Sequence, residues 1–210
     1  MDEKTLQKIQ TYFLDKLTNF GTTPQGVDWN SMEAQELRFY QLIKLLPENS
    51  QDYSLLDYGC GYGAFLTFLR DKGINCHYVG YDCLKNMIDQ AELLHKNDQR
   101  SKFVCESTVA EKFDYSIGSG VFNQKVDTDT EGWTEYVMKT LDSINEASKR
   151  GFAINFLTSY SDPEKMREDL YYPDPCKLFD YCVRNYSRNV AILHDYGAYE
   201  FTLAVRKSQM

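Results

Sequence analysis

The chain has 210 residues, of which 42% are hydrophobic, and a formal net charge of −8. This length predicts a single α/β domain with a full hydrophobic core. The basic residues form no cluster, and nucleic-acid binding usually shows a basic patch, so RNA and DNA are disfavoured as partners. No apolar run reaches the length of a membrane span, and the residues after Met1 lack the basic-then-apolar form of a signal peptide. We therefore expect a cytoplasmic protein with no membrane partner.

Cysteine and histidine are scattered along the chain. None of the six cysteines forms a C-x-x-C pair, and the three histidines stand at positions 77, 95 and 194. Zinc sites usually need closely spaced thiolate and imidazole ligands, so we predict no metal site and reduced thiols. The sequence carries no signal for the oligomeric state.

The first fifty residues are predicted to form a helical extension. From residue 2 to 20 the apolar side chains fall on one helical face, made by Leu6, Ile9, Phe13, Leu17 and Phe20. A loop reaches Trp29, and Asn30 with Glu33 fits a capping pair for a second helix that ends at Pro47. Arg38 falls in this second helix, where it could pair with a ligand carboxylate or form an ordinary salt bridge.

The segment from Ser54 to Leu66 organises the rest of the chain. It is a short apolar strand, a glycine turn and the start of a helix, and the turn reads Gly59-Cys60-Gly61-Tyr62-Gly63. Glycines at alternate positions let the backbone approach a ligand closely, and the helix directs its free N–H groups into the turn. The turn therefore predicts a nucleotide-like cofactor.

Two kinds of cofactor fit this turn. Gly59, Gly61 and Ala64 match the G-x-G-x-x-G/A pattern of nicotinamide and flavin enzymes, whose pyrophosphate lies against the turn. Asp57, two residues before the first glycine, separates the alternatives. A fixed carboxylate there opposes a pyrophosphate but attracts a cationic ammonium, such as that of S-adenosylmethionine (SAM). We therefore favour SAM.

The run from Asp57 to Gly63 resembles the first motif of class I SAM-dependent methyltransferases, and the resemblance covers about residues 52–206. It implies a Rossmann-like α/β fold with a seven-stranded, mostly parallel sheet, a C-terminal antiparallel hairpin and an N-terminal helical extension. It also implies that SAM contacts Asp57, Gly59, Cys60, Gly61 and Gly63. A finer likeness is to small bacterial methyltransferases.

Later strands supply further predicted SAM contacts. The second strand, over residues 76–82, ends at Asp82, whose carboxylate could accept two ribose hydroxyls or cap the next helix, over 84–94. Cys83 and Leu84 would then flank the adenine. The third strand, over 102–107, carries Glu106, which the resemblance places near the adenine amine; a glutamate that faces solvent fits equally well.

The fourth strand starts at Phe113 and leads into Ser119, Gly120 and Asn123, which resembles the fourth methyltransferase motif. Ligands lie beyond the carboxyl ends of parallel strands, so Ser119 and Asn123 should border the transferred methyl group. We further expect a helix over 133–150, a fifth strand over 152–157, a helix over 176–185 and a hairpin over 190–206. The segment 161–175 is predicted to be part of an acceptor lid.

The resemblance implies one domain over 1–210, with 1–50 as extension or lid and 51–210 as SAM-binding core. It implies methyl transfer to oxygen or nitrogen of a small-molecule acceptor, chiefly by positioning. A hydroxyl or ammonium must lose a proton, and histidine titrates near neutral pH, so His194 is the preferred base, with Tyr196 and Asn123 as positioning groups. A structural role for His194 stays open. So do a protein or RNA acceptor, a non-catalytic SAM-binding protein and a nicotinamide enzyme.

Overall fold

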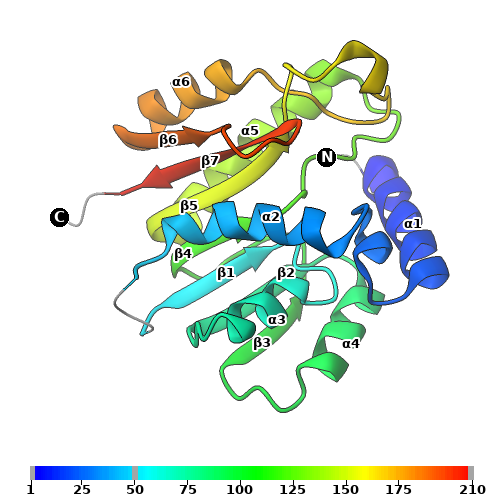
Figure 1. Ribbon diagram of the computed structural model, residues 1–210, viewed down its shortest axis with the longest axis vertical. Coiled ribbons are helices and arrows are strands. Elements are labelled where there is room, and N and C mark those ends of the chain that lie inside the picture. The colour runs from blue at the N-terminus through cyan, green and yellow to red at the C-terminus, as the bar shows by residue number, and fades with distance from the viewer. Residues whose placement is uncertain (1–2, 49–51, 208–210) are drawn as a thin grey trace.

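The computed structural model describes residues 3–48 and 52–207, and its centre is a seven-stranded sheet (Figure 1). The strand order is β3-β2-β1-β4-β5-β7-β6. The strands are β1 (Ser54–Tyr58), β2 (His77–Asp82), β3 (Ser101–Cys105), β4 (Phe113–Gly118), β5 (Ser148–Leu157), β6 (Asn189–Leu193) and β7 (Glu200–Arg206). β1 to β5 pair in parallel, whereas β7 pairs antiparallel with both β5 and β6. The predicted Rossmann-like sheet with a terminal antiparallel hairpin is confirmed.

Six α-helices accompany the sheet within the described residues. They are α1 (Glu3–Phe20), α2 (Met32–Leu42), α3 (Ala64–Asp71), α4 (Lys85–Leu94), α5 (Thr130–Ala147) and α6 (Pro175–Asn185). Short 3₁₀ helices cover Pro24–Val27, Ile43–Leu45 and Pro163–Lys165. Asp2, where the first helix was expected to start, and the predicted boundary between residues 50 and 51 lie outside the described residues. No helix in the described part of the chain is long and apolar enough to cross a membrane.

The sheet is buried on both faces, which explains the nearly continuous apolar strands. On one face Leu55 and Ile117 pack against Phe39 of α2 and Leu66 of α3. On the other face the side chains of β5 and β7 pack against α5 and α6, around Trp133. This layering leaves the carboxyl ends of β1, β2 and β4 free to carry polar side chains.

Two local expectations about helix starts are wrong. Ser31, not Asn30, is the N-cap of α2, because the Ser31 hydroxyl accepts a hydrogen bond from Ala34 N at 3.1 Å. Asp82 does not cap α4 as an N-cap residue, since Leu84 holds that position. The Asp82 carboxylate instead accepts from the Leu84 N–H at 2.9 Å and thereby fixes the turn between β2 and α4.

Hydrogen bonds join α1 to the turn after β2 and, within the helical extension, to Asp28. α2 lies along the sheet, while α1 lies on the side toward which the β1 arrow points (Figure 1). Gln10 of α1 donates to the carbonyl oxygen of Cys83 at 3.1 Å, and Tyr12 donates to Asp28 at 2.7 Å. Of the apolar face predicted for the first helix, Ile9 packs against the core around Trp133, and Phe13 and Leu17 pack against a smaller cluster with Leu84 and Met87. Leu6, Ile9 and Phe13 also line a cavity at the strand ends.

Candidate functional site

A cavity of about 190 Å³ lies beyond the carboxyl ends of β1, β2 and β4. One buried water needs only about 10–15 Å³, so the space is suited to a ligand. We distinguish two parts of its wall. The glycine-turn half comprises residues 57–62 and 82–84. The β4-exit half comprises Trp29, Ser119, Gly120, Val121, Asn123, Gln124, Tyr136 and Leu170.

The glycine turn has a backbone that side chains would not permit. Gly59, Gly61 and Gly63 have φ angles of +74°, +53° and +83°. A Cβ on Gly59 would lie 2.4 Å from Val121, and one on Gly63 would lie 2.9 Å from the ring of His95. Gly59 and Gly61 line the cavity, whereas Gly63 lies behind it as the N-cap of α3. The turn therefore needs glycine for its conformation and for its close packing.

Asp57, at the end of β1, is a buried carboxyl group that lines the cavity. Its Oδ2 accepts a hydrogen bond from the Tyr78 hydroxyl at 2.5 Å. Burial raises the pKa of Asp57 to about 7, although the Tyr78 hydrogen bond acts in the opposite direction. A buried carboxylate without a counter-charge is unfavourable, because it has lost its hydration. A cationic ligand group that binds beside it restores a favourable interaction.

Asp82, at the end of β2, is held by two backbone N–H groups. Its Oδ2 accepts from Gly61 at 2.9 Å, and its Oδ1 accepts from Leu84. Burial raises the pKa of Asp82, while these backbone hydrogen bonds lower it. Each oxygen keeps a lone pair, so the carboxylate can still accept ligand hydroxyls. The neighbouring residues Cys60, Cys83 and Leu84 line the cavity as well.

The β4-exit half holds two polar atoms without a partner. Ser119 Oγ and Asn123 Oδ1 are buried, and neither makes a hydrogen bond within the described protein. Both residues line the cavity. Buried polar atoms are normally paired, so these two mark a place where a ligand can bind. Glu106, which follows β3, also lines the cavity but is exposed.

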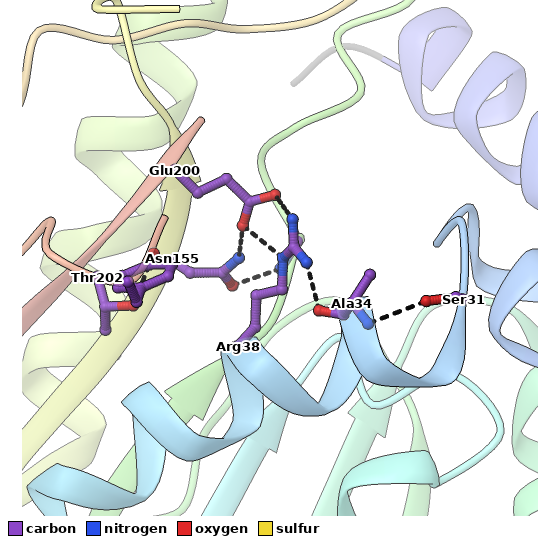
Figure 2. A network of polar contacts seen from close by, with 8 residues as sticks. Ser31, Ala34, Arg38, Asn155, Glu200 and Thr202 are labelled. Atoms are coloured by element: carbon purple, nitrogen blue, oxygen red, sulfur yellow. Dashed lines mark hydrogen bonds and ion pairs between the residues drawn. The ribbon is translucent and has the colours of Figure 1, made fainter. Parts of the chain in front are cut away.

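Arg38 does not line the cavity, because its guanidinium is committed elsewhere. Its Nε and Nη2 donate to the two carboxylate oxygens of Glu200, at 2.9 and 2.5 Å, and its Nη1 donates to the carbonyl oxygen of Ala34 (Figure 2). Of the two roles that the sequence left open, the structure gives it the salt bridge. With 12% of the Arg38 side chain and 3% of the Glu200 side chain exposed, the pair is nearly buried.

The ion pair belongs to a polar network (Figure 2). The network reaches the cavity wall at Gly120. Asn155 Nδ2 donates to Glu200 at 2.8 Å, and Asn155 Oδ1 accepts from the Gly120 N–H at 2.8 Å. The Arg38 guanidinium also lies 4.7 Å from the ring centroid of Trp29, whose edge abuts Gly120. The network thus fixes both Trp29 and the start of the β4 exit.

His194 and Tyr196 lie away from the cavity. His194 is exposed, and its ring contacts those of Tyr160 and Phe201. The Tyr196 hydroxyl lies 3.3 Å from Thr202 Oγ1, and burial raises the pKa of this phenol. β6 is the edge strand, three strands from β4, which at about 4.8 Å a strand is about 14 Å. The arrangement does not bring the expected base to the expected site.

Several cavity residues escaped the sequence-based prediction of a role. Trp29, Gln35, Gln124 and Tyr136 line the cavity from the extension, the β4 exit and α5. From the expected lid segment, Leu170 lines the cavity. One feature of the sequence could have revealed the network that fixes Trp29. Asn155 is a polar residue inside an otherwise apolar strand, and a buried amide needs hydrogen-bond partners.

The strand order and the glycine turn with Asp57 define a protein of the class I methyltransferase superfamily. The sequence comparison agrees, because residues 32–189 match the methyltransferase domain family and the chain belongs to it. A protein of Mycobacterium tuberculosis, Rv1506c, to which a methyltransferase function is provisionally assigned, is 49% identical over 157 residues. The match covers 74% of this chain and 94% of that relative. The sequence-based recognition of the superfamily is confirmed.

Solved structures share the fold. Human N-acetylserotonin methyltransferase, crystallised with SAM, has a TM-score of 0.68 at 12% identity over 99% of this chain, which spans 60% of the human protein's length. The 1,6-didemethyltoxoflavin-N1-methyltransferase of Burkholderia thailandensis, with S-adenosylhomocysteine (SAH), has a TM-score of 0.67 at 15% identity and covers 100% of this chain and 91% of that one. The N-methyltransferase NodS of Bradyrhizobium japonicum, also with SAH, has a TM-score of 0.68 at 14% identity, covering 95% and 98%.

Proposed function

We propose that this methyltransferase transfers a methyl group to oxygen or nitrogen of a small-molecule acceptor. Residues 1–50 act as the extension that closes the cavity, and residues 51–210 act as the cofactor-binding core of the same domain. The observation that carries the proposal is one cavity that combines a cofactor wall, with Asp57, the glycine turn and Asp82, and an opposite wall with the unpartnered Ser119 and Asn123.

The cofactor is S-adenosylmethionine, which supplies a methyl group already activated by a positive sulfur. The residues of the glycine-turn half fit it. Asp57 offers a carboxylate to the ammonium, and Asp82 offers two oxygens to the ribose hydroxyls. Gly59 and Gly61 bring the backbone of the turn to the cavity wall, while Cys83, Leu84 and Glu106 are placed for the adenine end.

A small acceptor fits the β4-exit half better than a macromolecule does. The extension contributes Trp29 to the β4-exit half and Leu6, Ile9 and Phe13 of α1 to the cavity wall, so the chain's own extension covers part of the cavity. The net charge of −8 opposes an RNA acceptor. Among the structural neighbours, the human and Burkholderia enzymes are named for small-molecule acceptors.

The direct test measures binding and turnover separately. Calorimetric titration with SAH, SAM and NAD should give binding of SAH and SAM and none of NAD. Incubation with SAM and a pool of small metabolites should release SAH and yield a methylated product of increased mass. Tight SAH binding with no SAH release from any pool would favour a non-catalytic SAM-binding protein, and binding of NAD alone would contradict the proposal.

A further inference from the structure

The β4-exit loop presents a hydrogen-bond acceptor that lacks a donor. Asn123 Oδ1 is buried and unpaired, and its loop is held in place at the backbone. The Asn123 N–H donates to Gly120 O at 3.2 Å, and its carbonyl oxygen accepts from Tyr171 N at 2.8 Å. These two hydrogen bonds fix the backbone of Asn123, and its Oδ1 has no donor within the described protein. The acceptor molecule is therefore expected to supply an N–H or O–H group.

The charged side chains that line the cavity in the described residues are all carboxylates, namely Asp28, Asp57, Asp82 and Glu106. Two cations contact lining residues without lining the cavity themselves, and both are paired: Arg38 binds Glu200, and Lys16 binds Asp28 at 2.6 Å. An anionic acceptor would have to approach these carboxylates in a chain of net charge −8. An uncharged acceptor avoids that repulsion.

Two aromatic residues belong to this half, besides Val121, Gln124 and Leu170. Trp29 and Tyr136 both line the cavity, and Trp29 is backed by the Arg38 guanidinium. Gly120, which has no side chain, lies against the edge of the Trp29 ring. Aromatic side chains at a cavity wall suit a planar ring as ligand, because aromatic rings pack favourably against one another.

Among the described residues, the β4-exit half and the residues next to it offer no base to an alcohol or phenol. Burial raises the pKa of Tyr58 and that of Tyr136, so both phenols stay protonated. The Asp28 carboxylate accepts from Tyr12 and pairs with Lys16. An uncharged nitrogen can attack through its lone pair before it loses a proton, whereas a hydroxyl needs a base first.

We propose that the acceptor is an uncharged aromatic amine or nitrogen heterocycle that donates an N–H to Asn123 and is methylated on nitrogen. This inference rests on the proposed function and narrows it. The nitrogen lone pair forms the N–CH₃ bond as the CH₃–S bond breaks, and the electron pair of that bond stays on sulfur, which leaves SAH. The cationic product nitrogen then releases its N–H proton to water.

The test compares 4-aminobenzamide with 4-aminobenzoate, which share a ring and an amine and differ in charge. Each is titrated into the full chain saturated with SAH, with ligand-observed NMR as the readout. We expect 4-aminobenzamide to bind at least tenfold more tightly than 4-aminobenzoate. With SAM in place of SAH, the methylated 4-aminobenzamide should carry its new group on the amine nitrogen.

Two variants assign the effect to the loop. Asn123→Leu, of similar volume, should weaken 4-aminobenzamide at least threefold and leave the SAH affinity unchanged. His194→Ala, a substitution away from the cavity, should change neither the affinity for 4-aminobenzamide nor the affinity for SAH. If SAH binds but 4-aminobenzoate is preferred, if neither probe binds at its solubility limit, or if Asn123→Leu has no effect, the inference is overturned while the proposed function stands. Failure of SAH itself to bind overturns the proposed function.

Discussion

The two halves of the cavity are built in different ways. The glycine-turn half comes from neighbouring residues in sequence, with Asp57 two residues before the first glycine and Asp82 at the end of the next strand. The β4-exit half is held by Arg38, Asn155 and Glu200, which come from α2, β5 and β7. The glycine-turn half, to which we assign the cofactor, is therefore supplied by short stretches of sequence. The β4-exit half forms only when distant parts of the chain have packed together.

The largest expected effect comes from breaking the buried ion pair. Arg38→Met leaves Glu200 buried without a counter-charge, so the free energy of unfolding should fall by about 3–5 kcal/mol. Urea denaturation measures this loss. The double variant Arg38→Met with Glu200→Gln should recover most of it, because the amide is uncharged and can still accept from Asn155.

The matched control is the exposed pair Arg184–Asp180 on α6. Arg184→Met should cost less than about 1 kcal/mol, since exposed salt bridges contribute little. Equal losses in Arg38→Met and Arg184→Met would contradict a structural role for the buried network.

The next effect concerns the glycine-turn half. Asp57→Asn keeps the shape and the Tyr78 hydrogen bond but removes the charge offered to the ammonium of the cofactor. The affinity for SAH should fall about 100-fold, equivalent to about 2.7 kcal/mol. The stability of the ligand-free fold should be unchanged or higher, because burial already disfavours the ionised carboxylate. Calorimetric titration and urea denaturation separate the two quantities.

Asp114→Asn is the control for this variant. Asp114 accepts from the Ser54 N–H and hydroxyl and does not line the cavity. Loss of the Asp114 charge should reduce the stability of the fold and leave the affinity for SAH unchanged. An unchanged SAH affinity in Asp57→Asn would remove the basis for the cofactor assignment.

The smallest effect is a dependence on pH. The pKa of Asp57 in the fold is raised to about 7, so the carboxylate is mostly ionised at pH 8 and mostly protonated at pH 6. SAH should therefore bind most tightly above pH 7, and its affinity should fall about tenfold from pH 8 to pH 6. For the ligand-free fold the sign is opposite, because a raised pKa removes stability as the pH rises through 7.

Tyr78→Phe sharpens this expectation. The Tyr78 hydroxyl stabilises the ionised form, so its removal should move the midpoint of SAH binding to higher pH by about one unit. At pH 8 this shift weakens binding only about twofold. A midpoint that moves to lower pH would show that Tyr78 opposes the charge instead.

Sequence reasoning found the parts of the site that depend on local spacing. Asp57, Gly59, Gly61 and Asp82 line the cavity as expected, because a strand that leads into a glycine turn fixes its end residues. The same logic placed Ser119 and Asn123 after β4. The seven-stranded, mostly parallel sheet with a final antiparallel hairpin was expected from the resemblance and is present.

Side-chain direction and long-range pairing could not be predicted in this way. Arg38 meets Glu200 across 162 positions of sequence, and no spacing rule links them. His194 was selected for its chemistry, but it follows the edge strand, so lateral distance separates it from the cavity. The position of Trp29 depends on its contacts with Gly120 and Arg38, and these contacts exist only in the folded chain.

The pairing of Arg38 with Glu200 has a consequence for the order of events during biosynthesis. At about 5–20 residues per second, a ribosome needs roughly 8–32 s to add the 162 positions between them. During that interval α2 emerges with a guanidinium that has no carboxylate to meet, and the wall beside Trp29 cannot be completed. A nascent chain stalled before β7 should therefore already contain its glycine turn but remain unable to assemble the second wall.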